Sequence, residues 1–341
     1  MGRRNQFTKK KLRALIEEGG QRVLPKFRQA AISNVSDPKL LEVLGFVCEY
    51  WKDNFRPAFA SLCCEAVGGR ADLVDRVSLM ITLTSAGGGI HDDIIDKSSN
   101  KHFRMTVLGK YGVDYALLAG DLLIQKGWMM ARNLFEKNFQ PQKLADIIEV
   151  FGRWTTDVCE AEFMEVQCRQ NLETELDYYE DLLVKSMADT QACARLGAIV
   201  GGGSKSKIEA LAEFGSRLGF IYRLTDDLKD TLNIEYNLSN RLQYESVPLP
   251  ILYAAKKTKG QKRVLEDIVT KSSFKDFDYT QILDACVKTK AFDYIIRRAE
   301  ETAKETTKKL ECLADSKSKN ALVFMINDSL CEILKLYKRA S

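Results

Sequence analysis

The chain has 341 residues, of which 45% are hydrophobic and 29% are charged, which is ordinary for a globular protein with a sizeable core. A formal net charge of +4 is too small to indicate nucleic-acid binding. Only two histidines are present, which argues against a multi-histidine zinc site or a Ser-His-Asp triad. Because no apolar run could span a membrane, no signal peptide is evident and the nine cysteines form no CxxC pair, we expect a cytoplasmic protein with reduced thiols.

Long intervals without proline indicate helices. None of the six prolines falls within residues 58–140 or 142–247, and apolar residues recur at a spacing of three to four. The patterns predict helices over residues 40–51, 117–134, 182–199, 208–232, 251–257, 260–271, 291–314 and 317–339, with Gly201 to Gly203 ending the third. No linker, repeat or change of composition divides the chain. We therefore expect one all-α domain covering residues 1–341.

A cluster of acids interrupts an apolar segment at residues 91–96. Asp92 and Asp96 are four residues apart and share one face of a helix, with Asp93 beside them. A buried cluster of this kind is unfavourable unless a cation neutralises it, and oxygen ligands favour Mg²⁺. The alternative is a helix end whose acids simply face water, and this segment alone does not distinguish the two.

The same pattern recurs at Asp226, Asp227 and Asp230, again after an apolar helical segment. Two such segments on separate helices could face each other across the cavity of a helical bundle. Their carboxylates would hold several Mg²⁺ ions and bind one diphosphate between them, and an apolar pocket would shelter the resulting carbocation. This repetition makes two unrelated exposed acid runs the weaker interpretation.

Several motifs, in order along the chain, resemble those of the trans-isoprenyl diphosphate synthases, or polyprenyl synthetases, of the class I terpenoid synthase fold. Phe55-Arg56-Pro57 resembles the end of a GGKRxRP segment, and the two acidic clusters resemble the two aspartate-rich motifs. Further similarity lies in residues 115–121, 185–186 and 247–254. The resemblance implies a single-domain helical bundle of the isoprenoid synthase type with a central active-site cavity. It also implies Mg²⁺, a prenyl diphosphate substrate, and a homodimer or a heteromer with a homologous subunit.

The residues that would ionise an allylic diphosphate are largely present. By resemblance, the expected metal ligands are Asp92, Asp93, Asp96, Asp226, Asp227 and Asp230. All of these except Asp230, together with Lys185, form the expected catalytic set. Lys185, Lys101 and Arg223 are expected to bind diphosphate. Ser246 stands where the family has a lysine, and Arg241 or Lys229 could supply the missing charge.

The site for isopentenyl diphosphate (IPP) looks depleted of cations. Trp51-Lys52-Asp53-Asn54 stands where the family has Gly-Gly-Lys-Arg, Ser85 replaces a histidine, and His102 replaces an arginine. The expected binding residues are Arg56, Lys52, Lys101, His102, Arg223 and Lys185. We expect a prenyltransferase that uses IPP or another acceptor. The alternatives are a terpene synthase, or a regulatory or non-catalytic subunit of a heteromeric synthase.

Residues 85–89 bear on chain length. By resemblance, this segment forms the pocket floor, and here it reads Ser-Ala-Gly-Gly-Gly. Three glycines in a helix cost about 1 kcal/mol each relative to alanine. They indicate either a kink and close helix packing, or an open floor that admits a prenyl chain of C20 or longer. We expect the latter.

Overall fold

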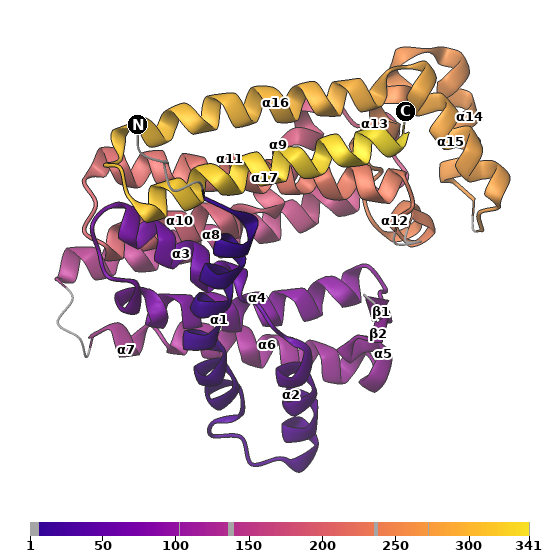
Figure 1. Ribbon diagram of the computed structural model, residues 1–341. Coiled ribbons are helices and arrows are strands. Elements are labelled where there is room, and N and C mark those ends of the chain that lie inside the picture. Colours follow the sequence, from indigo (N-terminus) through magenta and orange to yellow (C-terminus); the bar gives the residue numbers. More distant parts are fainter. Residues whose placement is uncertain (1–6, 102, 136–139, 235–237, 272, 341) are drawn as a thin grey trace. The chain divides into compact units, whose positions relative to one another are not determined.

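The computed structural model describes residues 7–101, 103–135, 140–234, 238–271 and 273–340 (Figure 1). In these residues the only sheet is a hairpin of two short strands, and all other regular elements are helices. The all-α fold class expected from the sequence is therefore confirmed. None of the described helices is both long and apolar enough to cross a membrane.

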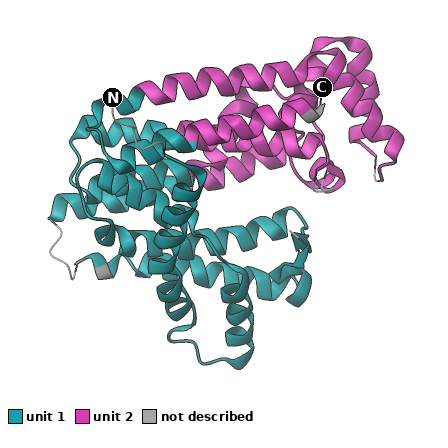
Figure 2. Cartoon of the chain, viewed as in Figure 1, with its two compact units in different colours: residues 1–155, 189–215, 309–325 teal, residues 156–188, 216–308, 326–341 magenta. Residues whose placement is uncertain are grey.

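The chain forms two compact units, each assembled from separated segments (Figure 2). Unit 1 comprises residues 1–155, 189–215 and 309–325, and unit 2 comprises residues 156–188, 216–308 and 326–341. Three long helices contribute to both units: α8 (Pro141–Cys168), α11 (Lys205–Thr231) and α17 (Lys317–Ala340). The expectation of a single domain stays a prediction.

Unit 1 holds the first acidic cluster. Its elements are α1 (Lys9–Ile32), α2 (Pro38–Tyr50), α3 (Phe55–Ala66), η1 (Ala71–Val74), α4 (Asp75–Ile95), β1 (Asn100–Lys101), β2 (Arg104–Met105), α5 (Val107–Tyr111), α6 (Val113–Met129), α7 (Arg132–Phe135), most of α10 (Ala188–Val200) and η2 (Leu310–Cys312). Helix α4 packs against α1, α3 and α6. The Asp37 side chain accepts a hydrogen bond from the Leu40 amide, and Pro38 follows it, so that α2 begins with a favourable N-terminal cap.

Glycine allows the close approach of α4 and α6. A Cβ atom on Gly87 would lie 2.5 Å from the Gly120 carbonyl oxygen, and one on Gly127 would lie 2.1 Å from Thr84 Oγ1. Side chains at these positions would force the two helices apart. Close packing therefore explains one of the three consecutive glycines in α4.

Unit 2 holds the second acidic cluster. Its remaining helices are α9 (Leu176–Ser186), α12 (Leu238–Tyr244), α13 (Leu249–Lys257), α14 (Lys259–Val269), α15 (Asp276–Lys288) and α16 (Ala291–Lys309). Helix α13 packs against α9, α14 and α15. Pro250 lies in the first turn of α13, where a missing backbone N–H removes no helical hydrogen bond.

Three expected helices have different extents in the structure. The helix expected over residues 117–134 ends at Met129, and Leu134 belongs to α7. The helix expected over residues 182–199 is interrupted at Met187, whose φ of −110° and ψ of 25° are not helical. The helix expected to reach residue 314 ends at Lys309. Where a break occurs, the apolar spacing continues because both sides of it face the same core, so periodicity alone does not reveal it.

Most of the cysteines serve as small core residues. All nine lie in the described residues as free thiols, and the six buried ones are Cys48, Cys63, Cys64, Cys168, Cys193 and Cys286. Burial raises the pKa of the Cys64 thiol to about 12. Buried thiols of this kind stay protonated and unreactive at neutral pH.

Candidate active site

The first acidic cluster lies at the C-terminal end of α4. Asp92 and Asp93 are in its last turn, and Asp96 caps the helix. The side chains of Asp93 and Asp96 are 9% and 7% exposed, while that of Asp92 is 37% exposed. The C-terminus of a helix carries a partial negative charge and disfavours nearby carboxylates, so the three acids need a cation.

Lys101, on the β1–β2 hairpin, supplies that cation. Its ammonium nitrogen lies 2.6 Å from Asp92 Oδ2, 2.9 Å from Asp93 Oδ1 and 3.9 Å from Asp96 Oδ2. Burial would lower the pKa of Lys101, but the Asp92 and Asp93 carboxylates outweigh it and hold that pKa above the ordinary value. The ammonium therefore stays charged. Burial also raises the pKa of the Asp93 carboxyl in spite of Lys101.

The chemistry of this cluster fits a magnesium ion. Its side-chain ligands are all carboxylate oxygens, and three of them already surround one positive charge. Even so, no group of three His, Cys, Asp or Glu side chains in the described chain is arranged to hold a metal. The three oxygens lie 2.6–3.9 Å from the Lys101 nitrogen, whereas Mg²⁺ binds oxygen at about 2.0–2.1 Å, so the carboxylates would have to move closer together to hold the ion.

The N-terminal end of α3 carries Arg56, which was expected to bind substrate. Its Nε lies 2.6 Å from Asp189 Oδ2 and its Nη1 lies 3.1 Å from Asp53 Oδ2, and both carboxylates are buried. Asp53 thus stands where the resemblance places a lysine, and its carboxylate also neutralises the charge of Arg56. Lys52 is exposed to solvent, and His102 lies outside the described residues.

Two uncharged polar side chains lie at positions of the expected acceptor site: Trp51, where the family has a glycine, and Ser85, where it has a histidine. Within the described residues, the Trp51 indole N–H and the Ser85 hydroxyl are buried and have no hydrogen-bond partner. The Trp51 ring would lie 3.3 Å from a Cβ atom on Gly89, so it packs on α4. A Cβ atom on Gly88 would meet nothing within 4 Å. Gly88 is one turn before Asp92 and therefore lies on the same side of α4.

The second acidic cluster ends α11. Asp227 is fully buried, and its carboxylate accepts hydrogen bonds from Tyr179 Oη at 3.1 Å, the Leu249 amide at 2.8 Å and Arg241 Nη2 at 3.4 Å. Asp226 is exposed and lies 3.8 Å from the Lys229 ammonium. One aspartate of this cluster is thus fixed by the protein, while its neighbour faces solvent.

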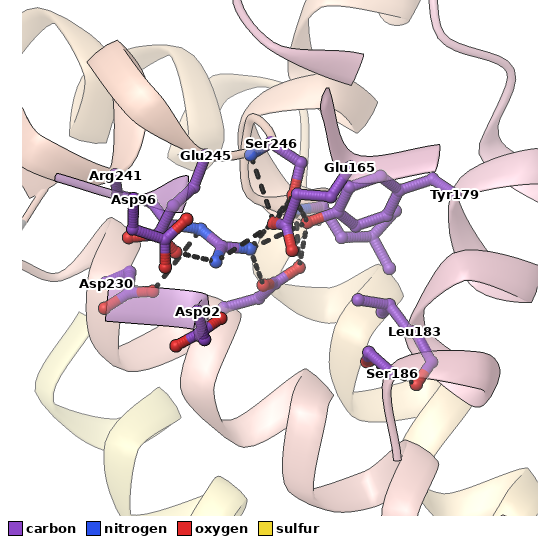
Figure 3. A network of polar contacts seen from close by, with 12 residues as sticks. Asp92, Asp96, Glu165, Tyr179, Leu183, Ser186, Asp230, Arg241, Glu245 and Ser246 are labelled. Carbon is purple, nitrogen blue, oxygen red and sulfur yellow. Dashed lines mark hydrogen bonds and ion pairs between the residues drawn. The ribbon is translucent and has the colours of Figure 1, made fainter. Parts of the chain in front are cut away.

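The Arg241 guanidinium is the centre of a buried network in unit 2 (Figure 3). Its Nε lies 3.7 Å from Asp230 Oδ2, its Nη1 lies 3.3 Å from Glu165 Oε1, and Nη1 also pairs with Glu245. Nη2 lies 3.1 Å from Ser246 Oγ. The guanidinium therefore reaches Ser246, the position where the resemblance places a lysine. This contact supports Arg241 as the residue that supplies the missing positive charge.

Charges in this network shift the pKa values of its acids. Burial would raise the pKa of Glu165, but Arg241, Arg223 and hydrogen bonds from Ser246 lower it to about 2. Burial raises the pKa of Asp230 to about 7. Burial and the charge of Arg241 lower the pKa of Arg223, but Glu165 and Asp227 outweigh them, so the net shift is upward.

Two expected diphosphate-binding residues also lie in unit 2. The Lys185 ammonium forms an ion pair with Glu160. In the described chain, Nε and Nη2 of Arg223 are buried without a hydrogen-bond partner. Lys101 and Arg56 belong to unit 1, so the expected binding residues are divided between the units. That the two acidic clusters face each other stays a prediction.

Sequence patterns did not indicate three members of the network: Glu165, Tyr179 and Glu245. Glu165 accepts hydrogen bonds from the Ser246 amide at 3.1 Å and from its hydroxyl at 2.5 Å, although 81 residues separate them. Tyr179 lies in α9, 48 residues before Asp227. No motif spacing links such distant positions. The one available signal was Ser246, which stands where the family has a lysine and for which Arg241 could supply the missing charge.

The sequence model of the polyprenyl synthetase family matches residues 39–286. This chain belongs to that family. The match includes both acidic clusters, Arg56, Lys101, Lys185 and the Arg241 network. The polyprenyl synthetase resemblance and the expected prenyltransferase activity are thereby confirmed at the level of the family.

Polyprenyl synthetases of several chain-length classes are similar to this chain. It is 24% identical over 294 residues to the octaprenyl diphosphate synthase of Haemophilus influenzae, covering 84% of this chain and 87% of that protein. It is 31% identical over 177 residues to the geranylgeranyl diphosphate synthase of Methanosarcina mazei, covering 51% of this chain and 53% of that protein. The solved structure of a geranylgeranyl pyrophosphate synthetase from Pyrococcus horikoshii matches with a TM-score of 0.84 at 20% identity, covering 94% of this chain and 98% of that chain. This structural likeness shows the common fold.

Proposed function

We propose that this polyprenyl synthetase is a magnesium-dependent prenyltransferase that ionises an allylic prenyl diphosphate and transfers the prenyl group to IPP or another acceptor. The observation that carries the proposal is the arrangement of Asp92, Asp93 and Asp96 around a single positive charge, 2.6–3.9 Å from the Lys101 nitrogen. A second DDxxD segment in α11 supports it.

The acids of the two clusters are the proposed metal ligands: Asp92, Asp93, Asp96, Asp226, Asp227 and Asp230. Bound magnesium would draw negative charge from the departing diphosphate and so ease cleavage of the allylic C–O bond. The Lys101, Lys185 and Arg223 cations would bind diphosphate oxygens directly. Asp227 already accepts three hydrogen bonds, so we assign it mainly to holding the end of α11 in place.

We propose a prenyl chain of C20 or longer. The support is Gly88, where an added Cβ atom would meet nothing within 4 Å, on the same side of α4 as Asp92. Because Gly88 has no side chain, this position leaves room for a longer prenyl chain. The relatives include octaprenyl and geranylgeranyl diphosphate synthases, whose products fall in this range, and also short-chain isoprenyl diphosphate synthases.

A second candidate function is that of a terpene synthase, which ionises the prenyl diphosphate and then cyclises it or quenches the cation with water. The pairing of Arg56 with Asp53 and Asp189 favours it, because an arginine already neutralised by two acids binds a second diphosphate poorly. The Ser85 hydroxyl, which stands where the family has a histidine, is buried and uncharged and favours the same function.

One assay separates these functions. The purified protein is incubated with Mg²⁺ and farnesyl or geranylgeranyl diphosphate, with and without IPP. Diphosphate release with a longer prenyl diphosphate product establishes the synthase. Release without IPP, giving a hydrocarbon or alcohol, establishes the terpene synthase. Release only after a homologous protein is added establishes the subunit of a heteromer, and no release under any condition contradicts both proposed activities.

We further propose a homodimer, or a heteromer with a homologous subunit, acting in the cytoplasm. The support for association is the exposed apolar surface of α6, where Leu117 and Leu118 are 48% and 62% exposed. Free thiols throughout the chain are typical of a reducing compartment. Light scattering on the wild type and on Leu118→Lys tests the assembly, and an unchanged mass would contradict this surface as the contact.

A further inference from the structure

Lys101 occupies the position at the first acidic cluster that a metal's charge would take. Three carboxylates lie within 3.9 Å of its nitrogen, and two of them lie within 2.9 Å. A divalent ion and an ammonium at the same carboxylates repel each other, and the oxygens paired with one are unavailable to the other. Metal binding at Asp92, Asp93 and Asp96 therefore competes with Lys101.

Lys101 is able to leave the cluster. Its side chain is 34% exposed, and it comes from a hairpin whose strands have only two residues each. A lysine side chain has four rotatable bonds, so its ammonium can move several ångströms without displacing the backbone. The carboxylates themselves are fixed more firmly, since two of them are almost fully buried at the end of α4.

We propose that Lys101 is an exchangeable internal counter-ion of the first acidic cluster, which diphosphate draws away so that magnesium can bind there. In the free protein the ammonium neutralises Asp92 and Asp93 and keeps the affinity for metal low. An arriving diphosphate offers Lys101 an alternative anion, and the carboxylates then become available to the metal that accompanies the diphosphate. Lys101 thus makes productive metal binding depend on substrate.

Arg241 in unit 2 is a counter-ion of a different kind. Its side chain is 3% exposed and pairs with four acids at once: Asp227, Asp230, Glu165 and Glu245. Removing it from these partners would leave several carboxylates buried and uncompensated. We therefore expect Arg241 to stay in place when ligands bind and assign the exchange to Lys101 alone.

The proposal predicts a measurable coupling. If diphosphate raises the affinity for metal by some factor, metal raises the affinity for diphosphate by the same factor. Removal of Lys101 takes away the competitor, so the affinity for metal without diphosphate should rise about tenfold, which corresponds to about 1.4 kcal/mol. The coupling factor should fall, because no counter-ion remains to be released.

The test is a binding measurement on the full chain at about pH 8, above the ordinary pKa range of carboxylic acids. Mn²⁺ binding is followed by electron paramagnetic resonance with and without inorganic diphosphate, and free metal is measured in each sample. The variants are Lys101→Met, Lys101→Arg, which keeps the positive charge, and the matched control Lys110→Met. The Lys110 ammonium lies 4.1 Å from the centre of the Phe46 ring.

We expect Lys101→Met to bind Mn²⁺ about tenfold more tightly than wild type without diphosphate, and Lys101→Arg and Lys110→Met to match wild type.

This inference rests on the proposed function, and different results would contradict the inference and the function. If wild type binds Mn²⁺ with diphosphate but Lys101→Met alone binds no more tightly than wild type, the exchange is wrong and the function stands. If no protein binds Mn²⁺ even with diphosphate, both are wrong. Circular dichroism and thermal unfolding confirm that each variant is folded.

Discussion

The phenolic oxygen of Tyr179 lies 3.1 Å from Oδ2 of Asp227, and it joins α9 to the acidic end of α11. Both residues are fully buried. Burial raises the pKa of Tyr179 well above its ordinary value, so the hydroxyl keeps its proton and donates to the carboxylate. The same Asp227 oxygen accepts from the Leu249 amide at the start of α13. Asp227 therefore ties three helices together at the second acidic cluster.

Loss of this hydroxyl should weaken both the fold and the site. We expect Tyr179→Phe to lower the free energy of unfolding by about 2 kcal/mol, because a buried carboxylate loses a donor. We expect kcat to fall about tenfold, because the end of α11 is held less firmly. Urea denaturation and steady-state diphosphate release measure the two effects.

The neighbouring Tyr178 is a matched control for that substitution. Tyr178 is 39% exposed, and its hydroxyl lies 3.2 Å from Gln167 Oε1. Tyr178→Phe should change the free energy of unfolding by less than about 0.5 kcal/mol. Equal effects of the two substitutions would show that Asp227 does not depend on Tyr179.

Local sequence features predicted the fold class and part of the helices, but not α1, α3, α8 or α15. The absence of proline over residues 58–140 and 142–247, combined with a spacing of three to four, indicated an all-α chain. The acidic clusters were visible because their members are at most four residues apart. The break at Met187 was missed because the apolar stripe continues through it. The β1–β2 hairpin was missed because its strands have only two residues each, too few to show an alternation of apolar and polar residues.

Ion pairing over long sequence separations could not be predicted. Arg56 resembled a substrate-binding residue, and nothing near it in the sequence indicated that Asp189, 133 residues away, would pair with it. Glu165 and Tyr179 carried no motif. These contacts arise from tertiary packing, which places distant helices side by side. The only indications in the sequence were Asp53 and Ser246, which differ from the residues that the family has at these positions. Each difference implied that charged side chains nearby are arranged differently.

The acid Glu165 should make stability depend on pH. Its pKa is lowered to about 2, below the ordinary 4.5, so it stabilises the fold fully above pH 4.5, and this contribution is lost as the pH falls toward 2. We expect Glu165→Gln to lower the free energy of unfolding by about 3 kcal/mol at pH 7. The difference from wild type should stay constant down to about pH 5 and shrink below it.

Urea denaturation across a pH series measures this difference. Glu149→Gln is the control, because Glu149 is on the same helix α8 but is exposed. That variant should track wild type within about 0.5 kcal/mol at every pH. A Glu165→Gln deficit as large at pH 3 as at pH 7 would rule out the Glu165 charge as its source.

Arg56 should matter more for folding than for binding IPP. Its removal leaves Asp53 and Asp189 buried without a cation, with side chains 6% and 8% exposed. We expect Arg56→Met to lower the free energy of unfolding by about 3–5 kcal/mol. Adding Asp189→Asn should restore about 1 kcal/mol or more, because one uncompensated charge is then gone.

The control for this prediction is Arg70→Met, since the side chain of Arg70 is 78% exposed and its pair with Asp72 is on the surface. Arg70→Met should leave stability unchanged. The KM for IPP is measured alongside, and we expect it to change less than about threefold in Arg56→Met. A large rise in the KM for IPP with unchanged stability would instead show that Arg56 binds the substrate.

The size of the side chain at position 88 should set product length. An added Cβ atom there meets nothing within 4 Å, whereas one at Gly87 would collide with the Gly120 carbonyl oxygen at 2.5 Å. Gly88→Phe should therefore fold, shorten the product by about one or more isoprene units, and raise helix stability by about 0.3–0.5 kcal/mol, since Phe is a weaker helix former than Ala. Chromatography of the prenyl products measures the length.

Gly45→Phe is the control, because Gly45 in α2 also faces open space and lies outside α4, so the products of this variant should match those of wild type. If Gly88→Phe is folded and active but makes products of unchanged length, this part of α4 does not border the growing chain.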